Sequence, residues 1–212
     1  MDNVVVVKLG GSSASSPDFA RWIEAVEKAT GNVVIIPGGG PFANTVRRYQ
    51  SRIGYDETAA HAMTILAMEQ FGYALKSLGT RMVTASSIEE IEAAFTDGKI
   101  PVWMPAGASL QHAELRDNHE VTSDSIAAWF AGRHRRSTLL LVKQLDVPAN
   151  ATVETLVHAE MVDPVFLDFL LPQTRIFLAG PGDIALAGKR FAEGGVPGRE
   201  LRKATDMLDA AE

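Results

Sequence analysis

Short runs of consecutive hydrophobic residues alternate along this chain with longer stretches in which apolar residues recur every three or four positions. The runs predict buried strands, and the periodic stretches predict amphipathic helices. The predicted strands cover residues 4–7, 33–36, 82–85, 100–104, 138–142 and 176–179. The predicted helices cover residues 18–28, 42–52, 57–77, 88–95 and 125–131. This alternation favours an α/β fold, a three-layer αβα sandwich around a central, mostly parallel sheet.

Two other stretches lack this regularity. The polar residues 109–121 predict an irregular loop that is free to carry function. After Gly198 the sequence predicts a polar helix at the end of the chain rather than a last strand. At 212 residues the chain fits one domain or two interdependent lobes, with no evident linker.

Two of the predicted strands end in loops that are almost free of side chains. The first reads Lys8-Leu9-Gly10-Gly11-Ser12 and the second reads Pro37-Gly38-Gly39-Gly40-Pro41. Because glycine has no side chain, such a loop lets backbone N–H groups approach a phosphate closely. A single loop of this kind is equally well explained as a tight turn between a strand and a helix. The order of residues matches neither a Walker A loop nor a dinucleotide-binding fingerprint.

The second loop strengthens the case for an anion site. Pro41 is suited to the first position of a helix, which directs free N–H groups and the positive end of the helix dipole toward the loop. Two such loops with Lys8 between them favour phosphoryl transfer. In that reaction, catalysis comes mainly from positioning of the reactants and from electrostatic stabilisation of the transition state.

A third polar cluster, Thr122-Ser123-Asp124, precedes the predicted helix over 125–131. Each of these residue types is a preferred helix N-cap, so capping alone explains any one of them. Three such residues in a row are more than one helix N-cap requires. A carboxylate at Asp124 could hold Lys8 charged and correctly aimed.

Composition narrows the class of protein. The formal net charge of −6 argues against a nucleic-acid binder, and the absence of cysteine excludes disulfides and thiolate sites. No stretch reaches the roughly 20 apolar residues of a membrane span, and the N-terminus does not resemble a signal peptide. We expect a cytoplasmic enzyme or binding protein.

The two glycine loops and the segment Thr122-Ser123-Asp124-Ser125-Ile126-Ala127-Ala128, in this order, resemble the amino acid kinase family. The resemblance implies ATP as donor, with Mg²⁺ held on the ATP phosphates rather than by side chains. It also implies an acceptor-binding lobe over approximately 1–115 and a nucleotide-binding lobe over 116–212. We further expect a homo-oligomer, in which the apolar helix over 57–77 lies either in the core or at a subunit interface.

The resemblance also implies individual roles. Lys8 would stabilise the transferring phosphoryl group and Asp124 would organise Lys8. The phosphate contacts would come from Gly10, Gly11 and Ser12 on the donor side and from Gly38, Gly39 and Gly40 on the acceptor side. Lys143 and Asp146 fall where the nucleotide-binding loop of the family begins.

Within the family, the chain most resembles the methanofuran-biosynthesis branch, which phosphorylates (aminomethyl)furanmethanol phosphate. The resemblance rests on the segment 38–44 with Arg47, the helix that contains His61, and residues 121–129. Arg47, His61, Thr122 and Ser123 are therefore candidates for binding a phosphorylated acceptor. Arg47 fits a solvated helix face equally well, and His61 also fits an ordinary interior or capping histidine. Because a phosphate nucleophile is already ionised near neutral pH, no general base is assigned.

The C-terminal half departs from the family pattern. Many members carry a second lysine beyond the nucleotide loop, but residues 154–171 contain none, so the role is vacant unless Lys143 or Lys189 fills it. Two hypotheses follow: an ATP-dependent small-molecule kinase, or a protein of the same fold that binds nucleotides or anions as a regulatory subunit.

Overall fold

The computed structural model describes residues 3–146 and 151–203, without the side chains of Ser12 and Ser13. Its seven described strands form one sheet in the order β3-β4-β2-β1-β5-β6-β7. All neighbouring strands are parallel except β6 and β7. The strands are β1 (Val5–Leu9), β2 (Val33–Pro37), β3 (Met82–Ala85), β4 (Ile100–Trp103), β5 (Thr138–Val142), β6 (Arg175–Ala179) and β7 (Arg199–Leu201).

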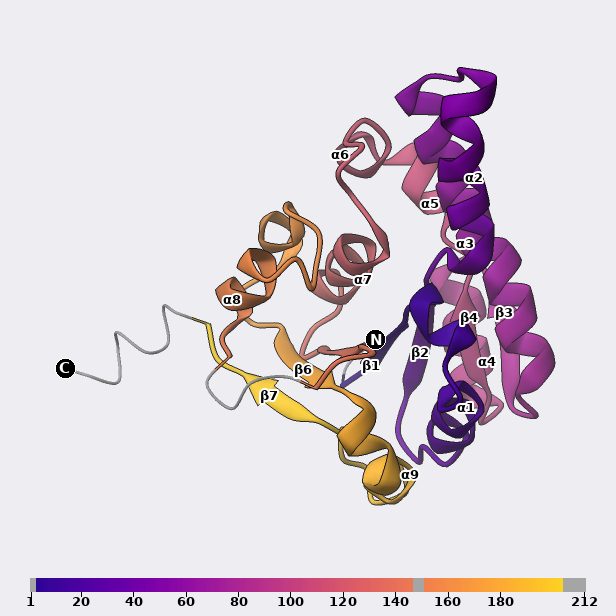
Figure 1. Ribbon diagram of the computed structural model, residues 1–212. Helices are drawn as coiled ribbons and strands as arrows, with labels where there is room; N and C mark the ends of the chain where they lie inside the picture. Colours follow the sequence, from indigo (N-terminus) through magenta and orange to yellow (C-terminus); the bar gives the residue numbers. More distant parts are fainter. Residues whose placement is uncertain (1–2, 147–150, 204–212) are drawn as a thin grey trace.

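Helices cover both faces of the sheet, which confirms the predicted three-layer αβα sandwich (Figure 1). The α-helices are α1 (Phe19–Glu27), α2 (Gly40–Ile53), α3 (Glu57–Leu78), α4 (Ile88–Thr96), α5 (Ala106–Gln111), α6 (Ala113–Arg116), α7 (Ser123–Gly132), α8 (Val153–His158) and α9 (Ile184–Ala192). The 3₁₀-helices are η1 (Gly11–Ser15), η2 (Phe166–Phe169) and η3 (Pro181–Asp183). None of the described helices is long and apolar enough to cross a membrane.

The alternation of side chains along β1 fixes the direction of its lysine. Val4 and Val6 pack into the hydrophobic cluster that contains α7, whereas Val7 and Leu9 pack into the cluster that contains α1 and α9. Since successive side chains of a strand point to opposite faces, Lys8 lies on the same face as Val6. The sequence of β1 therefore directs Lys8 toward α7.

The order of the strands determines where a ligand would bind. From β1 the chain adds β2 on one side of the sheet and later returns to add β5 on the other side. The strand order thus reverses at β1, and in open α/β sheets ligands bind at the carboxyl ends of the strands beside such a point. Both Lys8 and the first glycine loop lie at this end of β1.

The structure corrects two expectations from the sequence. Residues 109–121 are not an irregular loop, because they contain the end of α5 and all of α6, where Leu115 is completely buried. A last strand, β7, does follow Gly198, which adopts a left-handed φ of +85°. A Cβ at Gly198 would lie 2.3 Å from the carbonyl oxygen of Leu178, so this glycine allows the close return to β6. Residues 204–212, where a polar helix was predicted, lie outside the described part of the chain.

Candidate active site

A cavity of about 300 Å³ lies at the carboxyl ends of β1 and β2 and beside the start of α7. It brings together segments that are far apart in the sequence. The residues that line it are Lys8, Gly10, Gly11, Gly39, Gly40, Ala43, Asn44, Arg47, Thr64, Met68, Thr122, Ser123, Asp124 and Lys143.

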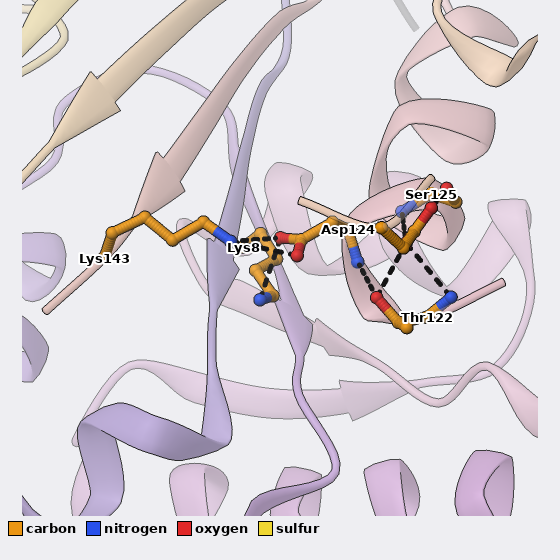
Figure 2. Close-up of polar contacts among 6 residues, drawn as sticks. Lys8, Thr122, Asp124, Ser125 and Lys143 are labelled. Atoms are coloured by element: carbon orange, nitrogen blue, oxygen red, sulfur yellow. Dashed lines mark hydrogen bonds and ion pairs between the residues drawn. The ribbon is translucent and has the colours of Figure 1, made fainter. Parts of the chain in front are cut away.

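At one end of this cavity two lysines converge on a single carboxylate (Figure 2). The Lys8 Nζ lies 2.9 Å from Asp124 Oδ1, and the Lys143 Nζ lies 2.9 Å from Asp124 Oδ2 and 3.0 Å from Oδ1. Lys8 and Asp124 are each only 6% exposed. We call these three residues the transfer centre, after the role that the family resemblance predicts for Lys8 and Asp124.

The charges of the transfer centre depend on one another. Burial by itself would raise the pKa of Asp124, but the positive charges of Lys8 and Lys143 outweigh it and hold that pKa below its usual value. Burial, together with repulsion by Lys8, lowers the pKa of Lys143 to about 8, against the opposing pull of Asp124. Lys143 is therefore a cation that can lose its proton within the ordinary pH range.

The two glycine loops pack directly against each other, which explains why they lack side chains. A Cβ at Gly11 would lie 2.1 Å from the Cα of Gly40, and a Cβ at Gly38 would lie 2.5 Å from the Gly11 nitrogen. Gly40 also has a φ of +59°, which disfavours other residues. The Gly38 N–H donates to the Leu9 carbonyl at 2.8 Å and joins the loops. Backbone from both strands thus forms one wall of the cavity.

The start of α7 is held by two kinds of contact. Thr122 is its N-cap, with Oγ1 accepting from the Asp124 N–H at 3.3 Å, as the capping interpretation of this segment predicts. In addition, Asp163 accepts hydrogen bonds from Thr122 and Ser125. Thr122 and Ser123 both line the cavity, but the Thr122 hydroxyl is engaged within the protein.

The other end of the cavity lies along α2 and α3. Asn44 and Arg47 come from α2, and Thr64 comes from α3. Arg47 is exposed and has neither an ion pair nor a side-chain hydrogen bond with any residue in the described ranges. We call Asn44, Arg47 and Thr64 the acceptor end, after the role that the family resemblance predicts for Arg47.

His61 does not line this cavity. It is buried on α3, and its Nε2 lies 2.8 Å from the Leu115 carbonyl oxygen. Its pKa is lowered, chiefly by burial. This geometry matches the alternative of an ordinary interior histidine. The contact between His61 and Leu115 joins α3 to the short helix α6.

The residues expected on the nucleotide side are separated. Lys143 belongs to the transfer centre, but Asp146 lies outside the cavity lining, where its Oδ1 accepts from the Gly182 N–H at 2.9 Å. Asp146 therefore ties the loop after β5 to the loop after β6. Lys189 lies on α9, where it is exposed and 3.8 Å from Glu193, so it takes no part in the transfer centre.

Several residues at the site were not predicted from the sequence. Thr64 lies within an apolar helix, and Asn44 was noted only as part of the segment that resembles the family. Asp163 is remote in sequence from the helix it contacts, and no local pattern marks it. Such contacts follow from packing between distant segments rather than from local periodicity.

The chain is similar to known proteins in its sequence and in its fold. Residues 3–148 match the profile of the amino acid kinase family. The chain is 25% identical over 126 residues to a [5-(aminomethyl)furan-3-yl]methyl phosphate kinase from Methanocaldococcus jannaschii, and the match covers 58% of each chain. The chain thus aligns with somewhat more than half of the length of that relative.

A solved structure extends the likeness to nearly the whole fold. The uridylate kinase from Archaeoglobus fulgidus superposes with a TM-score of 0.61 and covers 93% of this chain and 99% of its own. At 18% identity this likeness concerns the fold alone.

Proposed function

The chain belongs to the amino acid kinase family, and we propose that it is an ATP-dependent kinase that phosphorylates a small acceptor which already carries a phosphate. The observation that carries the proposal is the transfer centre, in which Lys8 and Lys143 meet at the buried Asp124 beside two glycine loops. Fixed cations at this position suit the negative charge of a transferring phosphoryl group.

The residues of the site fit the phosphates of ATP. Gly11 and Gly40 bring the backbones of the two loops together in the cavity wall with no side chain between them, and the two lysines supply positive charge beside it. When bound, Mg²⁺ would neutralise part of the charge on the phosphates. As the family resemblance implies, we propose that the ATP phosphates, rather than side chains, hold the ion.

The proposed reaction is a single transfer. An oxygen of the acceptor attacks the γ-phosphorus of ATP, the bond from that phosphorus to the β,γ-bridging oxygen breaks, and ADP leaves with the electron pair. Lys8 lies on the central strand β1 and stabilises the transferring group. Lys143, at the end of β5, stabilises the charge that develops on the leaving β-phosphate, a role that the sequence left open.

Two features support a phosphorylated acceptor. Arg47 presents an exposed guanidinium at the acceptor end, and a guanidinium can hold a phosphate through two parallel hydrogen bonds. Moreover, Asp124 is ion-paired to both lysines and is ill suited to act as a base, whereas a phosphate nucleophile needs none. The name of the Methanocaldococcus jannaschii relative supports an aminomethylfuran methyl phosphate, and thus a step in the synthesis of a methanofuran-type C1 cofactor.

The arrangement of the transfer centre favours catalysis over a purely regulatory role. A protein that only binds nucleotides or anions gains nothing from an aspartate that neutralises two cations in its own binding site. A homo-oligomer is supported by large apolar side chains that are exposed along α2 and α3, namely Phe42, Tyr49, Ile53, Met63, Leu66, Tyr73 and Leu78.

An ADP-release assay tests the proposed function. The purified chain is incubated with ATP, Mg²⁺ and a panel of phosphorylated acceptors that includes an aminomethylfuran methyl phosphate, beside their unphosphorylated counterparts. We expect acceptor-dependent ADP release with a phosphorylated compound. Failure of every acceptor to stimulate ADP release, in a protein that binds ATP, would overturn the kinase proposal and leave the regulatory one.

A further inference from the structure

We propose that Asp163 is a positioning residue for phosphoryl transfer, because its carboxylate holds the first turn of α7 and thereby aims Asp124 at the two lysines. This inference rests on the proposed kinase function. Asp163 lies between α8 and η2 and is 7% exposed. No pattern in the sequence predicts a role for it.

The carboxylate of Asp163 accepts four hydrogen bonds from only two residues. Its Oδ2 accepts from the Thr122 N–H at 3.1 Å, the Thr122 hydroxyl at 2.7 Å and the Ser125 N–H at 3.1 Å. Its Oδ1 accepts from the Ser125 hydroxyl. These donors lie on both sides of Asp124 in the chain, so one side chain fixes the backbone before and after the residue that binds both lysines.

The contacts suit a carboxylate better than an amide. All four donors point at Asp163, and an ionised carboxylate is acceptor-only, with room for all of them. In asparagine one oxygen becomes an NH₂ group, and the negative charge is lost. Facing the donors of Oδ2, the NH₂ group would leave the Thr122 and Ser125 N–H groups without an acceptor. Facing Ser125, it would force the Ser125 hydroxyl to turn and accept instead of donate. A negative charge at this place also suits the N-terminal end of the ten-residue α7.

Asp163 also acts on the transfer centre through its charge. The charged groups that bear on Lys143 are Lys8 from β1, Asp124 from α7 and Asp163. The negative charge of Asp163 is among the influences that raise the pKa of Lys143 against the effect of burial. Removal of that charge should therefore make Lys143 lose its proton at a lower pH.

A role in folding alone predicts a different result. A purely structural Asp163 would affect the melting temperature and the amount of folded protein, but not the turnover of the molecules that fold. A positioning role predicts a loss of kcat in folded protein with little change in KM. It further predicts a change in the titration of Lys143, which can be measured without any turnover.

The test compares Asp163→Asn with Asp168→Asn in the full chain. Asp168 is a suitable control because it lies nearby on η2, is exposed, and its side chain has no hydrogen bond or ion pair with other described residues. Because displacement of a reacting group by about 1 Å can cost roughly 10²-fold in rate, we expect Asp163→Asn to lower kcat by about 10- to 100-fold. The KM values for ATP and acceptor should stay near those of the wild type, and Asp168→Asn should match the wild type.

The second readout is the titration of Lys143 in the free protein. Trace labelling with acetic anhydride across a pH series, followed by mass spectrometry, reports the protonation of each lysine. We expect the Lys143 titration to move below that of the wild type in Asp163→Asn and to stay unchanged in Asp168→Asn. A folded Asp163→Asn variant with wild-type kcat, or with an unmoved Lys143 titration, would overturn the inference.

The two proposals fail in distinguishable ways. If the wild type shows no turnover but the Lys143 titration moves in Asp163→Asn, the kinase proposal fails while the contact of Asp163 with the transfer centre stands. If Asp163→Asn does not fold, Ser125→Ala removes one of the four donors and keeps the charge. A fall in kcat of a few-fold without a change in KM then supports the inference, and an unchanged kcat contradicts it.

Discussion

The transfer centre and the acceptor end lie in the same cavity but are built in opposite ways. Lys8, Asp124 and Lys143 are largely buried, and each is within 2.9 Å of an oppositely charged atom. Arg47, at the acceptor end, is exposed and has no partner within the described part of the chain. The charges proposed to act on the transition state are thus arranged during folding, whereas the charge proposed to select the acceptor is left for the ligand to order.

This contrast predicts different kinetic consequences at the two ends. Substitutions in the transfer centre should lower kcat, because they remove interactions made in the transition state. Substitutions at the acceptor end should chiefly raise the KM of the acceptor. Kinetics of variants at each end can contradict this separation of effects on kcat and KM.

The largest effect is expected for Asp124→Asn. The substitution leaves Lys8 and Lys143 without their shared counter-charge, and Lys143 should then lose its proton more readily. We expect kcat to fall on the order of 10³-fold, which is the upper part of the range for loss of one electrostatic contact to a transition state.

The matched control for Asp124→Asn is Asp117→Asn. Asp117 is also an aspartate that forms a close ion pair, with Arg116, but it is exposed and lies outside the cavity. Steady-state kinetics on both variants, with melting curves to confirm folding, decides the matter. A folded Asp124→Asn enzyme with near-normal kcat would show that the buried carboxylate is not needed for turnover.

The contact between the glycine loops should be the next most sensitive feature. In Gly11→Ala the new Cβ would lie 2.1 Å from both the Cα and the nitrogen of Gly40, so the backbones must move apart. We expect a loss of stability of about 1–3 kcal/mol, as for other overpacked sites. A kcat loss of roughly 10²-fold should accompany it, as for other displaced catalytic groups. Gly31→Ala is the control, since nothing lies within 4 Å of its Cβ. Equal melting temperatures and activities in the two variants would contradict the packing argument.

At the acceptor end, Arg47→Ala should act on binding. Loss of a charge-assisted hydrogen bond typically costs about 1.5–3 kcal/mol, so we expect the KM of a phosphorylated acceptor to rise by roughly 10- to 100-fold. The KM for ATP should barely change. Arg48→Ala serves as the control, because Arg48 lies over the Tyr49 ring and does not line the cavity. An unchanged acceptor KM in Arg47→Ala would remove the main reason for preferring phosphorylated substrates.

The smallest expected effect is a dependence on pH. The pKa of Lys143 is about 8, so the side chain is charged below that pH and neutral above it. Because the charged form is the one proposed to act, kcat/KM should fall as pH rises through about 8, whereas bound phosphates should move the fall in kcat to higher pH. Lys143→Arg keeps its charge throughout this range and should lose the inflection. An inflection that persists in an active Lys143→Arg variant would mean that another group titrates.

The central strands were predictable because their cause is local. β1, β2 and β5 are almost entirely buried, so each appears as a continuous apolar run. The glycine loops after β1 and β2 are evident in the sequence, but the close contact between them joins distant segments and was not predicted. The period of two along β1 also fixes the face on which Lys8 lies. Local sequence patterns thus predicted the sheet, the edge of the sheet at which the site lies, and the position of Lys8 on the central strand.

The remaining parts of the site depend on contacts between distant segments. Lys143 reaches Asp124 because β5 pairs with β1 in a register that sets Leu9 beside Val142, and no local pattern specifies that register. We propose that Lys143, one of the two lysines that the sequence left as alternatives, fills the role for which residues 154–171 offer no lysine. Likewise, the burial of Leu115 against the core accounts for α6, which the polar sequence around it conceals.

The central claim is that Lys8 and Lys143 act as one unit through Asp124, and a double-mutant cycle on kcat tests it most directly. Lys8→Ala, Lys143→Ala and the double variant are compared with the wild type at saturating ATP and acceptor. Because residues of one ion-pair network are not independent, we predict that the double variant loses much less than the product of the two single losses. Losses that multiply, to within about 0.5 kcal/mol, would contradict the account.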